Sequence, residues 1–190
     1  EMRVTETSKE CAGFLTMKRG VEIECIHYAS MPYTSLASLN KVKELARLIS
    51  VYQGQIKLHI ISFTNTQMEI YRVCDESYVI TMMRRMMYRL AQRLAEKNKC
   101  LAIVNGESIG QVASQTLESM AAISEVADMP VIRPCATLDK LEIIDLAKQI
   151  KTYETSILPY EDCCTIFTPK NPVIRPKKDK CRWYEEKYDF

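Results

Sequence analysis

Strand-like and helix-like patterns of apolar residues alternate along this chain. Residues 21–28 carry apolar side chains at every second position and then in a nearly continuous run, as a strand entering a sheet does. Residues 36–52 carry apolar side chains at helical spacing. The same alternation predicts strands at 55–61, 100–104 and 130–133, and helices at 75–97 (one helix, or two that meet near Thr81), 111–127 and 138–150.

Alternating strands and helices predict an α/β fold with three αβα layers and a mostly parallel sheet, connected by right-handed crossovers. Ligands of such sheets bind at the carboxyl ends of the strands. We therefore expect His27 with Tyr28, the segment after residue 104, and Arg133 with Pro134 along one edge of the molecule. The methionines at 82, 83, 86 and 87 are expected to fill the core.

The segment from Asn105 to Gln115 is the first candidate for a binding site, because it follows an apolar run and precedes a predicted helix. A helix N-terminus has unpaired N–H groups and partial positive charge, which favour an anion. Gly106 and Gly110 would let the backbone approach a ligand closely. The alternative is a tight strand-to-helix turn with capping side chains.

Composition narrows the class of protein. The chain has 190 residues, 47% hydrophobic and 26% charged, which is typical of one globular domain, and a net charge of +2 that does not by itself indicate nucleic acid. No apolar segment approaches the roughly 18 residues that span a membrane, and no secretory signal is evident, so a cytoplasmic location is expected.

The cysteines and histidines give little sign of a metal site. The eight cysteines lack paired CxxC spacing, and His27 and His59 are the only histidines, so we expect no structural metal. Cys25, Cys100 and Cys135 lie in or beside apolar runs, and most cysteines are expected to be reduced core residues.

Several separated motifs resemble the ThiI family of tRNA 4-thiouridine synthetases. They are residues 104–119 (VNGESIGQVASQTLES), 132–134 (IRP), 139–143 (DKLEI) and 161–163 (EDC), preceded by 17–23 (MKRGVEI) and 32–34 (PYT). The resemblance covers about residues 12 to 170 in the same order. It implies a PP-loop catalytic domain of the adenine-nucleotide alpha-hydrolase-like fold at 1–168, leaving a basic, proline-containing tail with a short final helix at 169–190.

The resemblance also implies an activity. Members of the family use ATP, with Mg²⁺, to adenylate a tRNA uridine, and a cysteine persulfide loaded by a cysteine desulfurase then displaces AMP. They also supply sulfur for the thiamine thiazole. The partners implied are tRNA, the desulfurase and a second copy of the chain in a homodimer, and no membrane. A nucleotide-binding relative without catalysis and an α/β interaction domain without nucleotide affinity are the alternatives.

The family's nucleotide-binding residues match five positions of this chain: His27, Tyr28, Arg84, Gly106 and Gln115. The family more often has Phe at the position of Tyr28. Arginine suits phosphate because its guanidinium group is planar and can donate two parallel hydrogen bonds. Without the resemblance, Arg84 would be read as part of a solvated helix face.

Three further residues match the family's catalytic positions: Asp139, Lys140 and Cys163. An Asp before an apolar periodic run is also a common helix N-cap, so a capping role for Asp139 is the alternative. Cys163 matches the cysteine that accepts or resolves the sulfur, although the neighbouring Glu161 and Asp162 disfavour a thiolate.

The chain departs from the family at its beginning. The family's phosphate-binding loop, Ser-Gly-Gly-x-Asp-Ser, follows a central strand, whereas residues 1–11 here are polar and contain no glycine. Met2 and Arg3 would occupy the nucleotide-contacting positions before that loop. Either the chain has diverged or a loop is missing between its flanks. The family's tRNA-binding module has no counterpart in these residues, so we expect weak tRNA binding by this chain alone.

Overall fold

The computed structural model of the chain describes residues 4–160 and 169–188, and its strands pair in parallel as predicted. Strand β1 (Cys25–Ala29) pairs with β2 (Leu58–Ser62) along five residues, and β3 (Ile103–Val104) pairs with β4 (Val131–Ile132) along two. Among the described residues the strands form two two-stranded sheets. All four strands are shorter than the apolar runs predicted.

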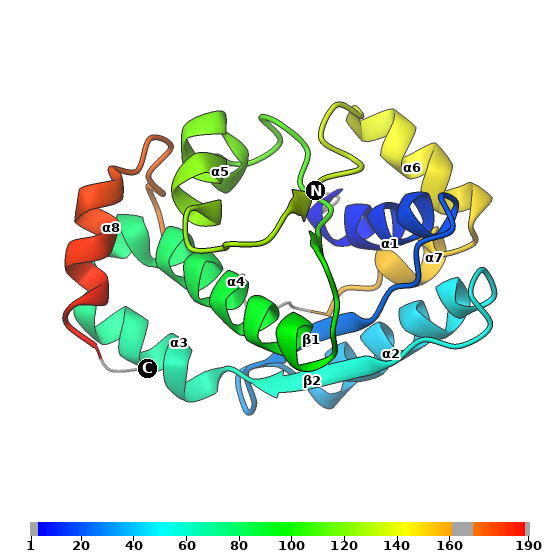
Figure 1. Ribbon diagram of the computed structural model, residues 1–190, viewed down its shortest axis with the longest axis horizontal. Helices are drawn as coiled ribbons and strands as arrows, with labels where there is room; N and C mark the ends of the chain where they lie inside the picture. The colour runs from blue at the N-terminus through cyan, green and yellow to red at the C-terminus, as the bar shows by residue number, and fades with distance from the viewer. Residues whose placement is uncertain (1–3, 161–168, 189–190) are drawn as a thin grey trace.

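Helices connect and cover these strands (Figure 1). Their bounds are α1 Val4–Met17, α2 Leu36–Ser50, α3 Thr64–Val73, α4 Val79–Lys97, α5 Leu117–Ser124, α6 Lys140–Gln149, α7 Tyr153–Ser156 and α8 Lys178–Glu185, with 3-10 turns η1 Glu76–Tyr78 and η2 Ala113–Gln115. The apolar pattern predicted α2, α4 and α6 closely, whereas it did not predict α1, α3 or α7. Helix α1 occupies the place at which the family's central strand was expected.

One core cluster lies around the first half of α4. Met82, Met83 and Met86 are buried there, which confirms that the methionines fill the core, and they pack with Phe63 and Ile70. The C-terminal segment belongs to the same cluster through three buried side chains, Cys181, Tyr184 and Tyr188. The short helix predicted in the tail is confirmed as α8, which lies beside α3 and the start of α4 (Figure 1).

A buried arginine holds α8 in place. Arg85 on α4 donates to both carboxylate oxygens of Glu185, at 2.7 and 2.8 Å, and at 3.0 Å to Glu125, which follows α5. It also donates to the carbonyl oxygen of Ala122. Burial disfavours the guanidinium charge, but the hydrogen bonds that Arg85 donates to Glu185 and Glu125 outweigh burial and raise the pKa of Arg85. A single side chain therefore joins α4, α5 and α8.

The second core cluster lies between α1, α2 and α6. Its buried members are Cys11, Ala12, Met17, Ile49, Cys135, Ile143, Ala147 and Ile150. Helix α1 contributes an apolar stripe at helical spacing, which packs on α6. Within the described ranges, no helix has the length and apolar character that a membrane span requires.

Candidate functional site

A buried carboxylate lies just beyond the end of β3 and binds two arginines. Glu107 is 2% exposed, and its Oε1 accepts a hydrogen bond from Nη2 of Arg84 on α4. Its Oε2 accepts from Nε of Arg133, at 2.7 Å, directly after β4. Two guanidinium groups therefore face one carboxylate at the carboxyl ends of β3 and β4.

Two neutral side chains fix the carboxylate in this cluster. Tyr88, one turn after Arg84 on α4, donates its hydroxyl to Oε2 of Glu107 at 3.2 Å. Asn105 donates Nδ2 to the same oxygen at 2.9 Å and also to the hydroxyl oxygen of Tyr88. Burial and then the charge of Glu107 raise the pKa of Tyr88 to about 12, so the phenol stays protonated and can donate.

Sequence reasoning identified Arg84 and placed Arg133 on this edge, but it did not predict the role of Glu107 or Tyr88 in joining them. The usable signal was the spacing of Arg84 and Tyr88, four residues apart on one face of α4. The expectation that the ends of β3 and β4 lie together is confirmed by their parallel register.

Gly106 is required by packing. A Cβ at this position would lie 2.4 Å from the carbonyl oxygen of Ser8 and 2.7 Å from the amide nitrogen of Lys9, both on α1. Only glycine fits there, because the neighbouring atoms belong to a helix backbone. The close approach predicted for Gly106 is therefore made to α1, and its contact with a nucleotide stays a prediction.

The helix predicted at 111–127 begins six residues later than expected, which corrects the anion-site prediction. Thr116 is the N-cap of α5, and its side chain accepts from the amide of Ser119 at 3.1 Å. The hydroxyls of Thr116 and Ser119 donate to the carbonyl oxygen of Ile174, at 2.6 and 3.3 Å. The C-terminal segment thus covers the start of α5, and the residues after Gly110 form a turn and η2.

Gln115 lies in η2 with an unsatisfied polar atom. The side chain is 4% exposed, and its Oε1 is buried without a hydrogen-bond partner. A buried acceptor without a donor carries a desolvation penalty, so it indicates a donor that is absent from the free chain. An adenine-nucleotide ligand has such donors in its amino group and ribose hydroxyls.

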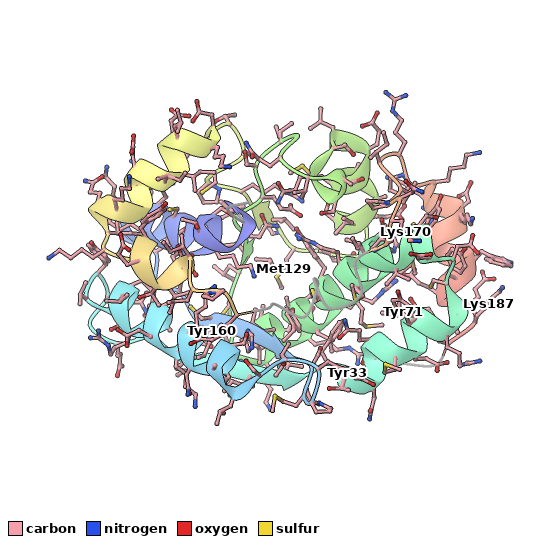
Figure 2. The ribbon with its side chains drawn as sticks, turned by 180° about the vertical axis from the view of Figure 1, so that it is seen from behind. Tyr33, Tyr71, Met129, Tyr160, Lys170 and Lys187 are labelled. Carbon is pink, nitrogen blue, oxygen red and sulfur yellow. The ribbon has the colours of Figure 1, made fainter. Side chains whose placement is uncertain are left out.

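His27 and Tyr28 point to opposite faces of β1, as consecutive strand residues do. The buried His27 lines a cavity of about 130 Å³ together with Glu10, Lys41 and Tyr160, and Figure 2 labels Tyr160 over α2. Tyr28 instead donates its hydroxyl to the carbonyl oxygen of Met87 at 2.5 Å. The two side chains therefore point away from each other, and the contacts of His27 and Tyr28 with a nucleotide stay predictions.

Asp139 caps α6, which confirms the capping alternative. Its side chain accepts from the amide of Glu142 at 2.9 Å, and Glu142 accepts in return from the amide of Asp139 at 2.7 Å. Ser108 donates to the carbonyl oxygen of Leu138 at 2.8 Å, which brings this cap beside the segment after β3. Lys140 is exposed at the first turn, and catalytic roles for Asp139 and Lys140 stay predictions.

Met2, Arg3 and Cys163 lie outside the described residues, so their predicted roles are not tested by the geometry.

All six described cysteines are free thiols, as expected. Burial raises the pKa of each, to about 12 for Cys11 and about 11 for Cys25 and Cys135. These thiols are poor nucleophiles near neutral pH. Among the described residues no group of three or more His, Cys, Asp and Glu side chains could hold a metal ion.

Parallel strands joined by helices, with polar and cationic side chains at their carboxyl ends, define an α/β protein. Its likeness to a solved structure identifies the adenine-nucleotide alpha-hydrolase-like fold. A crystal structure of a 4-thiouridine synthetase–RNA complex with bound ATP has this fold: its TM-score with this chain is 0.91 at 40% identity, covering 97% of this chain and 48% of that one. The family model for the thiamine biosynthesis protein ThiI matches residues 8–190. The chain belongs to the ThiI family.

Curated relatives agree with this assignment. A probable tRNA sulfurtransferase of Oceanobacillus iheyensis is 50% identical over 179 residues, which cover 94% of this chain and 45% of the relative. One of Halothermothrix orenii is 54% identical over 176 residues, covering 93% of this chain and 44% of the relative. The chain thus spans about half the length of these relatives.

Proposed function

We propose that this chain is the nucleotide-binding catalytic part of an ATP-dependent tRNA sulfurtransferase that forms 4-thiouridine and also serves thiamine thiazole synthesis. The likeness to the ATP-bound 4-thiouridine synthetase, at a TM-score of 0.91, carries the proposal. The partners proposed are tRNA, a cysteine desulfurase and a second copy of the chain, and the location proposed is the cytoplasm.

The described residues fit an adenine nucleotide. Gln115 offers a buried acceptor that lacks a donor, and the guanidinium group of Arg84 lies against Glu107 just beyond the end of β3. Mg²⁺ would arrive with the nucleotide, since it commonly binds phosphate oxygens and keeps much of its water rather than occupying a protein cage. The nucleotide-binding roles proposed for Met2, Arg3, His27, Tyr28, Arg84, Gly106 and Gln115 follow from this fit and from the family resemblance.

The proposed reaction has three steps. The C4 oxygen of the uridine attacks the α-phosphorus of ATP and releases pyrophosphate, so that a poor leaving group becomes a phosphate ester. The terminal sulfur of a persulfide on Cys163 then attacks C4, AMP leaves with the oxygen, and a disulfide joins Cys163 to C4. A second thiol, such as that of free cysteine, attacks Sγ of Cys163, so that 4-thiouridine is released and Cys163 is left in a mixed disulfide with that thiol. The raised pKa values of the six described thiols make them unsuited to carry a nucleophilic sulfur. Of the two other cysteines, Cys163 and Cys164, the family resemblance assigns this role to Cys163.

A thiolation assay tests this function. Because weak tRNA binding is expected of this chain alone, the chain is supplied with the tRNA-binding module of a family member and incubated with unmodified tRNA, ATP, cysteine and a cysteine desulfurase. The tRNA nucleosides are then analysed by mass spectrometry. We expect 4-thiouridine from the unmodified chain, none from Cys163→Ser, and an unchanged yield from the control Cys100→Ser. An equal yield from both variants would contradict the role of Cys163.

The alternative is a nucleotide-binding relative without catalytic activity. One observation favours it: residues 1–11 lack the glycines with which the family binds phosphates, and α1 already begins at Val4. Calorimetric titration with ATP distinguishes the two functions when it accompanies the thiolation assay. ATP binding without 4-thiouridine supports the alternative, and the absence of ATP binding contradicts both.

A further inference from the structure

Arg133 has no part in the function proposed so far, yet it binds the same carboxylate, Glu107, as Arg84 does. We propose that Arg84 and Arg133 together bind the phosphates of the nucleotide, and that Glu107 is the positioning residue that holds the two guanidinium groups side by side. This inference rests on the proposed ATP binding. It adds a second phosphate-binding arginine and the carboxylate that orients both.

The hydrogen bonds of Arg133 leave it able to bind a phosphate. A guanidinium group has five N–H donors in a planar fork. Arg133 uses Nε on Glu107 and approaches the hydroxyl of Tyr88 with Nη2 at 3.5 Å, and it makes no hydrogen bond through Nη1 within the described part of the chain. Its side chain is 19% exposed, so the guanidinium can reach a ligand while Glu107 fixes its orientation.

The place of the cluster also favours an anionic ligand. Arg84 and Arg133 come from different parts of the chain and contact one carboxylate at the carboxyl ends of β3 and β4, which is where parallel sheets bind their ligands. A phosphate contact from two arginines matters more here, because residues 1–11 contain no glycine loop.

Calorimetric titrations with ATP, AMP and adenosine test the role of Arg133. For Arg133→Gln we expect ATP and AMP to bind about tenfold or more weakly, as loss of a charge-assisted contact predicts, with adenosine binding unchanged. Arg133→Lys should recover only part of the loss, because a lysine lacks the planar fork. The control is Arg72→Gln, an exposed arginine paired with Glu69 on α3, which should change nothing.

The substitution Glu107→Gln distinguishes a role of Glu107 in orienting the two arginines from a purely electrostatic effect of its charge. Removing the carboxylate raises the positive charge of the cluster, so electrostatics alone predicts tighter ATP binding. If Glu107 orients the arginines, the variant should bind ATP about tenfold more weakly, because neither arginine is then held in place. Since this variant could fail to fold, Tyr88→Phe provides a milder test that removes one hydrogen bond to Glu107, and ATP binding should weaken more than adenosine binding.

The outcomes distinguish the inference from the function on which it rests. If the unmodified chain does not bind ATP, the proposed function itself fails. If the chain binds ATP but Arg133→Gln weakens ATP and adenosine equally, or neither, the phosphate role is wrong. If Arg133→Gln weakens tRNA binding and leaves ATP unchanged, Arg133 contacts RNA instead and the proposal is overturned. Tighter ATP binding by Glu107→Gln contradicts positioning.

Discussion

Gly106 lies so close to Ser8 that a Cβ on the glycine would be 2.4 Å from the carbonyl oxygen of Ser8. This contact joins the segment after β3 to helix α1, two parts of the chain almost one hundred positions apart. Both contacting groups are backbone, so neither can rotate away. Helix α1 can therefore lie against the cluster around Glu107 only because residue 106 is a glycine, whose side chain is a hydrogen atom.

Gly106→Ala should destabilise the chain by about 3 kcal/mol or more, because overpacking against a rigid backbone forces α1 to move. Chemical denaturation followed by circular dichroism measures the change. Gly13→Ala is the matched control: its Cβ would meet only the tips of Ile23 and Ile49 side chains, at 3.2 and 3.6 Å, and alanine favours the helix. Equal effects of the two substitutions would show that the Gly106 contact is unimportant.

Arg85→Met should destabilise the chain by about 3–5 kcal/mol, because it leaves the carboxylates of Glu125 and Glu185 without their buried partner. The fluorescence of Trp183 on α8 reports whether that helix detaches first. Arg93→Met, at an exposed position of the same helix α4, should change stability by less than about 0.5 kcal/mol. An undiminished stability in Arg85→Met would mean that apolar packing alone holds α8.

The stability that Glu125 contributes should depend on pH. Burial works against ionisation, but hydrogen bonds from Arg85 and Arg182 outweigh it and lower the pKa of Glu125 from 4.5. Because the folded-state pKa is the lower one, the ion pairs stabilise the fold above about pH 4.5 and lose this effect as the pH falls below it.

Glu125→Gln should therefore reduce stability by about 1–3 kcal/mol at pH 7, and thermal unfolding should show the difference from the unmodified chain shrinking towards pH 3. Glu118→Gln is the control, since Glu118 is exposed and its contact with Arg175 is solvated. If the difference in stability between Glu125→Gln and the unmodified chain stays constant with pH, the shape of the Glu125 side chain, rather than its charge, stabilises the fold.

The sequence predicted those elements whose local signals agree with their packing. Helix α2 has Ser35 as its N-cap and apolar residues at helical spacing, and α6 has a complete capping box. Strand β3 is shorter than its apolar run because only Ile103 and Val104 face a partner strand, and Leu101 is 87% exposed. Hydrophobicity predicted a strand, but the length of the neighbouring strand determined how much of it formed.

The candidate site was predictable only in part. Its edge followed from the topology rule, and Arg84 followed from the family motif. The partners of Glu107 come from positions 23 residues before it and 26 residues after it, and no local pattern reveals that these side chains meet. The start of α5 was mispredicted because Gly110 has a φ of 78° and Thr116 provides a stronger cap than the residues before it.

Substitutions at Asp139 can separate capping from catalysis. Asp139→Ala should destabilise the chain by about 1 kcal/mol through loss of the N-cap, whereas Asp139→Asn keeps a capping oxygen and should preserve stability. Thiolation assays on the stable Asn variant then report on the carboxylate alone. Full activity would leave Asp139 as a cap only, and strongly reduced activity would give it a catalytic role.

Gln115→Met provides the sharpest test of nucleotide binding, because stability and binding should respond differently. Oε1 of Gln115 is buried without a partner, so methionine, with a similar length and no polar atom, should leave the free chain as stable or make it about 1 kcal/mol more stable. ATP binding should weaken about tenfold, because a hydrogen bond in the complex is lost.

Calorimetry with ATP and thermal unfolding of the free chain measure the two effects. Ser114→Ala is the control, since Ser114 is the neighbouring buried residue in η2 and should not alter ATP binding. A Gln115→Met variant that loses stability and keeps its ATP affinity would show that Gln115 supports the fold and not the ligand. The opposite result would place the nucleotide against η2.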